Sequence, residues 1–301
     1  MRKLAFGYAT RCNIRCRHCV ATEGVASGKK MDSRTAEKII VEMARAGVGG
    51  ISFSAGEPLL YFEEIAALVL LCSRLEIYTR VVTNSFWAKT VESSNQRISE
   101  LKKRGLCQLR LSYSRWHQEH VHRDNVLRAV ESCRRSGLDY FVSFVTDFSE
   151  KDEPYEAFLR ERGLTFFPEP VIYAGRAGSF KRRQLITDYQ ANRCDMNPYL
   201  SPDLDMYACC DAGSHFGDTG FFYLGNLKDQ RVDQLFARTE TDRLFNLIRT
   251  MGITPIASFA GMPSREIITY TKCELCRKLF NSTETLAGLR RNLSKLEAWT
   301  R

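Results

Sequence analysis

The sequence lacks long apolar runs, a secretory hydrophobic region, internal repeats and low-complexity segments. No apolar run approaches the roughly 18 residues of a membrane-spanning helix, so a membrane protein is not expected. With 301 residues, 44% of them hydrophobic, the chain can form one large core and a smaller appended one. Without secretion signals, the 11 cysteines predict a cytoplasmic protein whose clustered thiols bind metal rather than form disulfides.

Blocks of basic residues are also missing, although the chain is basic overall. The formal net charge is +9 and the isoelectric point is about 9.0. This balance favours an acidic partner, such as an acidic peptide, a nucleic acid or an anionic cofactor. Because the charges are scattered through helical patterns, most indicate solvated helix faces, and neither a nucleic-acid nor a membrane partner is expected.

Up to about residue 175, apolar strand-like runs alternate with amphipathic helical patterns, which predicts parallel β/α units. The six expected strands are residues 4–8, 49–54, 77–83, 107–113, 140–146 and 164–167. The expected helices are residues 33–46, 62–74, 94–104, 121–136 and 154–162. In such folds ligands bind beyond the carboxyl ends of the strands, so residues that follow each strand are candidate site residues.

Three cysteines with C-x3-C-x2-C spacing, Cys12, Cys16 and Cys19, follow the first expected strand. Three thiolates within eight residues can bind three corners of a cuboidal iron–sulfur cluster and leave the fourth iron without a protein ligand. A structural zinc site is the alternative. Zinc normally takes four protein ligands, and no fourth Cys or His is suitably placed nearby, although His18 could compete.

This motif, followed by Ala55-Gly56-Glu57-Pro58, resembles the radical S-adenosylmethionine (SAM) enzymes, whose usual second signature is Gly-Gly-Glu-Pro. Ala55 is a small departure from that signature. The resemblance implies a partial (β/α)6 barrel and a [4Fe–4S] cluster on Cys12, Cys16 and Cys19. It also implies that the open iron binds the amino and carboxylate groups of SAM. An electron from the cluster then cleaves SAM to a 5′-deoxyadenosyl radical, which abstracts a hydrogen atom from the substrate.

The same resemblance suggests residues that bind SAM, beginning with Gly56 and Glu57 of the second motif. Glu57 would pair with the SAM ammonium group; the alternative is a carboxylate that is only favoured by a helix N-terminus. Asn84 is either a turn residue or a contact of the ribose or carboxylate. Ser112 is either a plain strand serine or a hydrogen-bond partner of SAM, and His18 is expected to shield the cluster and border the adenine.

Basic and aromatic side chains crowd the loop after the fourth expected strand: Arg115, Trp116, His117, His120, His122 and Arg123. Arginine pairs bidentately with carboxylates, so this loop is a candidate for contact with the substrate or with the SAM carboxylate, and a solvated loop is the alternative. Arg176 lies in a Gly-Arg turn that resembles one after the sixth strand of related enzymes, and it is the preferred arginine for SAM.

Cysteines return after Asp188, where helical periodicity fades: Cys194, Cys209, Cys210, Cys273 and Cys276. An expected hairpin over residues 201–210, the segment 224–227 and a helix over 232–236 resemble the one-cluster, twitch form of the SPASM extension. Leu204 stands where that hairpin usually has glycine.

The twitch resemblance implies a second [4Fe–4S] cluster, bound by Cys194, by Cys209 or Cys210, and by Cys273 and Cys276. Tetrahedral zinc is the alternative. The expected organisation is a barrel over residues 1–187, a small cysteine-rich α+β domain over 188–281 and a C-terminal helix over 282–301. The leucines of that helix form one packing stripe.

One thiol of the Cys209-Cys210 pair is left over. Neighbouring strand residues point to opposite faces, so Cys210 should point away from a cluster bound by Cys209. There it could give a hydrogen atom to a carbon radical, as radical SAM peptide epimerases are understood to do. Alternatively, Cys210 is a small buried hydrophobe or the true ligand. Cys72, Cys107 and Cys133 are expected in the core.

The predicted function is hydrogen abstraction from a ribosomally made precursor peptide, with Cα epimerisation as the most specific version. A small-molecule dehydrogenase or epimerase for an alcohol or aminocyclitol is the alternative, and an iron–sulfur scaffold is disfavoured. A flavodoxin- or ferredoxin-type protein is the expected electron donor. Because the cysteine motif begins at residue 12, binding of a leader peptide would need the barrel itself or a separate leader-binding protein.

Overall fold

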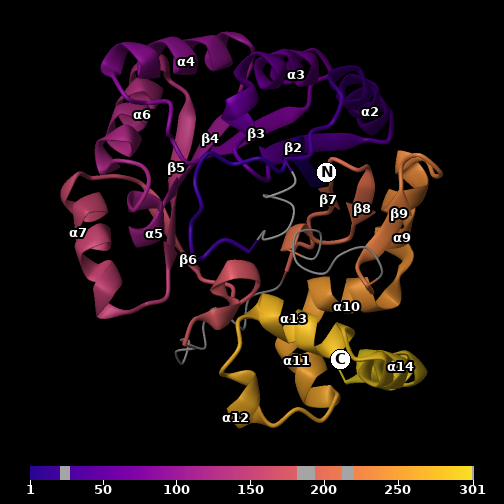
Figure 1. The fold of residues 1–301 in the computed structure, drawn as a ribbon. Coiled ribbons are helices and arrows are strands. Elements are labelled where there is room, and N and C mark those ends of the chain that lie inside the picture. Colours follow the sequence, from indigo (N-terminus) through magenta and orange to yellow (C-terminus); the bar gives the residue numbers. More distant parts are fainter. Residues whose placement is uncertain (21–27, 182–193, 212–219, 300–301) are drawn as a thin grey trace. The chain divides into compact units, whose positions relative to one another are not determined.

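The computed structural model describes residues 1–20, 28–181, 194–211 and 220–299 (Figure 1). The chain divides into two compact units. The first comprises Met1–Val171 with Ser201–Asp203, and the second comprises Ile172–Leu200 and Leu204–Arg301. The domain boundary expected after residue 187 lies outside the described residues.

Parallel strands, which follow one another in chain order, form the sheet of the first unit. They are β1 (Arg2–Gly7), β2 (Val48–Ser54), β3 (Tyr78–Thr83), β4 (Gln108–Tyr113), β5 (Asp139–Thr146) and β6 (Phe166–Pro170). All six expected strands are therefore confirmed, with ends displaced by at most three residues. Their order is that of a partial barrel, as expected for the α/β fold class.

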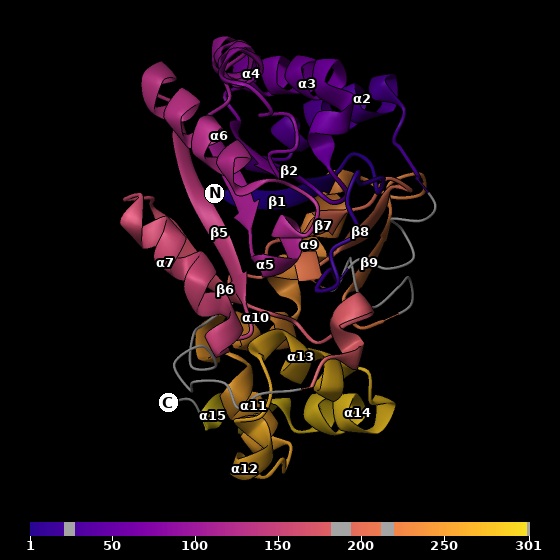
Figure 2. The same cartoon turned by 60° about the vertical axis from the view of Figure 1, so that its left-hand side comes forward.

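Helices cover one face of this sheet (Figures 1 and 2). They are α2 (Ser33–Arg45), α3 (Phe62–Arg74), α4 (Val91–Lys103), α6 (Arg123–Ser136) and α7 (Glu153–Glu161), with the short α5 (Arg115–Gln118) and the 3-10 turns η1 (Pro58–Tyr61) and η2 (Glu150–Asp152) between them. The sequence marks several of these ends. Thr90 and Ser93 form a capping box at the start of α4, and Gly137 ends α6 with φ 65°.

Strand alternation separates an apolar face from a polar one. Leu109 and Leu111 of β4 are fully buried on the helix-covered face, and Phe6 and Phe53 meet there with ring centroids 5.5 Å apart. Arg110 of β4 lies on the opposite face. The apolar face supplies the core, whereas the other face is free to carry polar groups.

The second unit contains an antiparallel sheet of β7 (Tyr199–Leu200), β8 (Asp205–Tyr207) and β9 (Tyr223–Asn226). A 3-10 turn, η3 (Gly175–Ser179), precedes it, and helices follow: α9 (Val232–Thr241), α10 (Arg243–Met251), α11 (Ile253–Phe259), α12 (Ser264–Ile267), α13 (Lys272–Phe280), α14 (Thr283–Arg291) and α15 (Leu293–Ala298). The hairpin of β7 and β8 was expected, and Leu204 at its turn adopts φ 74°, the conformation usual for glycine.

Two expectations for this unit were wrong. Helices α10 to α13 were not predicted, because helices of four to nine residues are too short to show a clear period. The single helix expected over residues 282–301 is broken at Asn292, between α14 and α15. Its leucine stripe does pack, since Leu289 and Leu296 are buried. Among the described residues, no helix combines the length and apolarity needed to cross a membrane.

Candidate active site at the carboxyl ends of the parallel strands

The loop after β1 carries the first three cysteines. The Cys19 amide donates a hydrogen bond to the Cys16 carbonyl (3.2 Å), so a tight turn brings these two residues together. Cys16 is buried, whereas Cys12 and Cys19 are half-buried. Burial raises the pKa of the Cys12 thiol to about 11, and the charges of Glu57 and Cys19 act in the same direction. Three thiols thus share one short loop.

The second motif presses against this loop through its backbone. Gly56 has φ 55°, and a Cβ atom there would lie 2.3 Å from the Arg11 carbonyl oxygen, so only glycine fits. The Glu57 amide donates to the same oxygen at 2.9 Å. Ala55 keeps a left-handed conformation (φ 69°) without being glycine, which costs about 1–2 kcal/mol. The departure from Gly-Gly-Glu-Pro therefore changes a side chain and leaves the turn intact.

Glu57 is buried and accepts three hydrogen bonds. One oxygen accepts from the Thr83 hydroxyl (2.8 Å) and the Leu59 amide (3.1 Å), and the other accepts from the Asn84 amide (2.7 Å). Burial raises the pKa of Glu57 to about 7, although these hydrogen bonds oppose the shift. The carboxyl group joins the ends of β2 and β3, and its contact with a SAM ammonium remains a prediction.

Asn84 connects the end of β3 to the cysteine loop. Its Nδ2 donates to the Asn13 side chain at 2.9 Å and lies 3.9 Å from the Cys12 sulfur. Its Oδ1 accepts from the Phe86 amide, which is the turn role considered from sequence. Ser112 lies near the end of β4, beside Ser143 of β5. For both residues the contact with SAM remains a prediction.

His18 lies against α5. Its ring is 4.9 Å from that of Trp116 and 4.7 Å from that of His117. A ring nitrogen of His18, one of His117 and the Cys16 sulfur lie within 4.8 Å of one another, so these three residues are a possible donor set for a single metal ion. The sequence did not single out His117 for this position, because only the fold of the loop after β4 brings it to Cys16.

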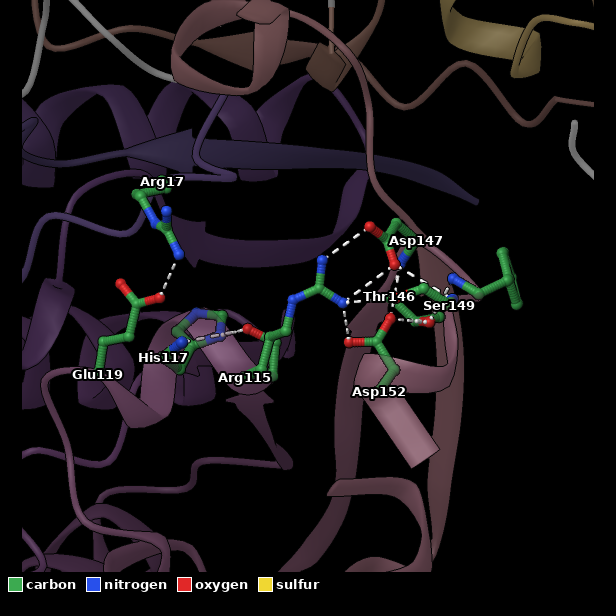
Figure 3. A network of polar contacts seen from close by, with 10 residues as sticks. Arg17, Arg115, His117, Glu119, Thr146, Asp147, Ser149 and Asp152 are labelled. Carbon is green, nitrogen blue, oxygen red and sulfur yellow. Dashed lines mark hydrogen bonds and ion pairs between the residues drawn. The ribbon is translucent and has the colours of Figure 1, made fainter. Parts of the chain in front are cut away.

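His117 is buried and its ring is held in place. The Ser114 hydroxyl and His117 Nδ1 are 2.7 Å apart. Burial lowers the pKa of His117 to about 4, and the charge of His120 adds to the effect, so the ring is neutral at physiological pH. Figure 3 shows His117 beside Arg115 and the Arg17–Glu119 ion pair (2.8 Å), which joins the cysteine loop to the end of α5.

Arg115, the residue before Trp116, is held by two carboxylates and a hydroxyl group (Figure 3). Arg115 donates to both oxygens of Asp147, at 3.0 and 2.7 Å, to Asp152 at 2.5 Å and to Ser149 at 3.1 Å. Burial disfavours ionisation of Asp147, but the hydrogen bonds and charge of Arg115 outweigh it and lower the pKa of this carboxyl. Two internal carboxylates therefore bind Arg115, and the contact of this loop with a substrate or SAM carboxylate remains a prediction.

The two arginines predicted to bind SAM, Arg123 and Arg176, lie in different places. Arg123 begins α6, and its guanidinium lies 5.0 Å from the centroid of the Phe158 ring. Arg176 belongs to η3 of the second unit, and its buried Nε has no hydrogen-bond partner among the residues that the structure describes. The role of both in SAM binding remains a prediction.

The cysteines of the second unit converge. The sulfur atoms of Cys209 and Cys210 and a carboxylate oxygen of Asp211 lie within 4.8 Å of one another, and Cys273 Sγ donates to Asp211 at 2.9 Å. Cys276 lies three residues after Cys273, on the same side of α13. Asp211 was missed from sequence, since no metal-ligand spacing marks it.

Charges on neighbouring thiols contribute to the pKa shifts of these cysteines, which agrees with their closeness. Burial raises the pKa of Cys194, and the charge of Cys209 adds to it. Burial also raises the pKa of Cys276, with Cys209 and Cys194 as the next causes. All four sulfurs expected to bind a second cluster therefore lie in one region of the second unit.

The expectation that Cys209 and Cys210 point to opposite faces of a strand was wrong. Strand β8 ends at Tyr207, so neither cysteine follows strand alternation, and Cys210 begins a helical turn. A hydrogen bond with Cys209 raises the pKa of Cys210 well above its usual value, and burial and Asp211 add to the shift. The two sulfurs share one environment, which leaves open which of them would bind metal.

A profile of the Radical SAM superfamily matches residues 8–161, which is more than half of the chain. The chain belongs to the radical SAM superfamily. The family implies a [4Fe–4S] cluster and SAM. The donor set of Cys12, Cys16 and Cys19 fits such a cluster, because it provides three thiols on one loop held by two backbone contacts of the second motif.

Curated relatives of this radical SAM chain include two peptide-related proteins. It is 22% identical over 218 residues to the "Putative peptide biosynthesis protein YydG" of Bacillus subtilis, covering 67% of this chain and 66% of that protein. It is 32% identical over 104 residues to the "PqqA peptide cyclase" of Bradyrhizobium diazoefficiens, covering 34% of this chain and 26% of the cyclase. The chain thus spans less than two thirds of either relative.

Solved structures include the crystal structure of BtrN in complex with AdoMet and 2-DOIA. It is 12% identical to this chain, with a TM-score of 0.48, and the match covers 89% of this chain and 91% of that one.

Proposed function

We propose that this radical SAM enzyme modifies a ribosomally made peptide and that its most specific reaction is epimerisation at Cα. The main support is the similarity to two relatives whose names refer to peptide biosynthesis and peptide cyclisation, one of which covers two thirds of the chain. The net charge of +9 suits an acidic peptide.

Two sets of thiols would carry the metal chemistry. Cys12, Cys16 and Cys19 would hold the cluster that reduces SAM, which supplies a 5′-deoxyadenosyl radical for hydrogen abstraction. Cys194, Cys209, Cys273 and Cys276 would hold a second cluster, whose closed ligand set suits electron transfer. Asp211 is close enough to these thiols to accept a hydrogen bond from one that is not bound to metal.

Cys210 would supply the hydrogen atom that completes epimerisation. Loss of a hydrogen atom from Cα leaves a planar carbon radical, and the Cys210 S–H bond would break homolytically to give its hydrogen to the opposite face. The remaining sulfur radical then takes one electron from a flavodoxin- or ferredoxin-type donor and one proton from water. The proximity of Cys209 and Asp211 gives this sulfur polar neighbours for that proton transfer.

The test uses reduced, iron-loaded enzyme, SAM and a candidate peptide in deuterium oxide. Epimerisation predicts 5′-deoxyadenosine and a product with one solvent deuteron at Cα. Cys210→Ala should still release 5′-deoxyadenosine but form at least about 100-fold less epimer, the lower end of what a positioned side chain contributes when it transfers a proton. Cys107→Ala, which changes a half-buried cysteine beside β4, is the matched control.

A product lighter by two hydrogens would instead identify a dehydrogenase. Unchanged epimer formation by Cys210→Ala would reject the role of this thiol.

A further inference from the structure

The sheet face opposite the helices carries two neighbouring arginines. Arg80 of β3 and Arg110 of β4 alternate with buried residues, so both side chains lie on this face. Their guanidinium groups lie 5.2 and 5.8 Å from the centroid of the Phe141 ring of β5. We call these three residues the arginine patch. Cation–π contact with one ring holds both charges in place.

Neighbouring side chains use only part of the hydrogen-bonding capacity of the patch. Arg80 Nε donates to Gln108 at 2.6 Å, and its two terminal nitrogens have no partner in the described part of the chain. Arg110 donates from one terminal nitrogen to Ser143 (3.0 Å) and to Glu169, and its Nε is buried without a partner. Each guanidinium has five N–H donors, so several are available to a ligand.

The charge of Arg80 is also incompletely balanced. Burial lowers its pKa, and the charge of Arg110 acts in the same direction, whereas Tyr78, Asp139 and Glu169 oppose the shift without reversing it. Glu169 is bound to Arg110, and Asp139 accepts from Gln108 (2.5 Å) rather than from Arg80. Arg80 has no ion pair with any described residue. A bound anion would relieve this repulsion and supply the missing counter-charge.

A carboxylate is the anion that fits best. Arginine binds its two oxygens in a planar, bidentate arrangement, and the contact with Phe141 limits rotation of the guanidinium. Two exposed aromatic residues flank the patch on the same face: Tyr78, which is 41% exposed, and Phe167, which is 56% exposed and 5.5 Å from Phe141. Arginine beside exposed aromatic rings is the composition of protein-binding surfaces.

Nucleic acid fits less well. Affinity for nucleic acid comes from several cations aligned with successive phosphates, and this patch has two arginines that sit beside Glu169 and Asp139. The acidic neighbours would repel a phosphate backbone. A single carboxylate carries one charge, so these neighbours repel it less than they repel a run of phosphates.

We propose that the arginine patch binds an aspartate or glutamate side chain of the peptide substrate and so selects peptides that contain an acidic residue. This inference rests on the proposed function. It assigns substrate recognition to the floor of the barrel, in the amino-terminal halves of β3 and β4.

The test compares two fluorescein-labelled 12-residue peptides, which alternate Phe and Gly around either two Glu or two Gln. Binding to wild-type enzyme with SAM is measured by anisotropy in 0.15 M salt. We expect about tenfold tighter binding of the Glu peptide, a conservative value for a charge-assisted bidentate contact. Arg80→Gln and Arg110→Gln should abolish this preference, and Arg80→Lys should keep only part of it, because lysine lacks the planar fork.

Arg104→Gln is the matched control. It removes the same charge from an arginine of similar exposure, since the Arg104 side chain is 33% exposed and that of Arg110 is 29% exposed. Arg104 lies at the end of α4, where its Nε donates to Glu100. An equal Glu preference in all variants, or none in the wild type, would overturn the proposal. Circular dichroism verifies that each variant is folded, and Arg80→Lys provides the test if Arg80→Gln is not.

A separate measurement keeps this inference distinct from the proposed function. Release of 5′-deoxyadenosine and modification of the peptide are followed with each variant. An enzyme that modifies peptides with the same KM in Arg80→Gln as in wild type would reject the patch alone. An enzyme that modifies no peptide, yet shows Arg80-dependent preference for Glu, would reject the proposed function and support the patch.

Discussion

The buried carboxyl group of Glu57 should make the free energy of unfolding depend on pH. Its pKa is about 7 in the folded protein and 4.5 in an unfolded chain. Between these values the folded carboxyl holds a proton that the unfolded one releases. The free energy of unfolding should therefore rise as pH falls from 7 to 4.5, by a total on the order of 3 kcal/mol from this group.

Glu57→Gln should remove this part of the pH dependence. Urea unfolding measures the free energy of unfolding of wild type and variant at several pH values between 8 and 5. The difference between the two proteins at each pH isolates the contribution of this carboxyl group. Glu63→Gln, which removes an exposed carboxylate from the first turn of α3, is the control. A constant difference between wild type and Glu57→Gln across this range would refute the raised pKa.

Ala55 and Leu204 show what a sequence motif predicts and what it omits. Both stand where a glycine is usual, and both adopt the left-handed conformation that glycine favours, with φ 69° and 74°. The motif thus specified the backbone even where the residue departed from it. The cost of that conformation in a non-glycine residue could not be read from the pattern, because it is offset by packing elsewhere in the fold.

At the scale of elements, Arg115 joins α5 to the connection between β5 and α7. Its side chain is 16% exposed, and those of Asp147 and Asp152 are 12% and 4% exposed. Arg115→Met should lower the free energy of unfolding by about 3–5 kcal/mol, because it leaves two buried carboxylates without a counter-charge. Chemical unfolding followed by circular dichroism measures the loss.

Arg160→Met is the comparison for this ion pair. Arg160 pairs with Glu156 on α7, but it is 67% exposed, so its loss should cost less than about 1 kcal/mol. The triple variant Arg115→Met, Asp147→Asn, Asp152→Asn should recover much of the lost stability by removing the uncompensated charges. Equal losses in Arg115→Met and Arg160→Met would contradict a buried ion-pair network.

Local periodicity predicted the first unit well and the second poorly. Strands and helices of the barrel alternate in long, regular patterns that end at glycines such as Gly137, so their order followed from sequence. Helices α10 to α13 are short, and their stability depends on packing rather than on propensity. The convergence of Cys209, Cys210 and Asp211 depends on where β8 ends, which hydrophobic pattern does not determine.

At the scale of the whole molecule, the two sets of cysteines proposed to bind metal lie in two compact units. Cys12, Cys16 and Cys19 belong to the first, whereas the cysteines from Cys194 onward belong to the second. Because no protein ligand is shared between them, each set should load separately. With three thiols, the first set would leave one iron of a cluster for SAM, and the second would supply a full set of four thiols.

Metal content should therefore divide between the units. Anaerobically purified wild type should contain about eight iron atoms, about four for each cluster. The triple variant Cys12→Ala, Cys16→Ala, Cys19→Ala should retain the four of the second unit, and Cys273→Ala with Cys276→Ala should retain the four of the first. Addition of SAM should change the paramagnetic spectrum of the latter variant and leave that of the former unchanged.

The same measurement distinguishes the cluster from a single zinc ion on Cys16, His18 and His117. A cluster on the first loop needs Cys19, so Cys19→Ala should lose iron from the first unit, whereas His117→Phe should keep it. A zinc ion on Cys16, His18 and His117 predicts the opposite result. Such an ion would be lost in His117→Phe and kept in Cys19→Ala, because His117 is a ligand and Cys19 is not. Zinc that survives Cys19→Ala and is released by His117→Phe would refute the open-iron site on which SAM cleavage depends.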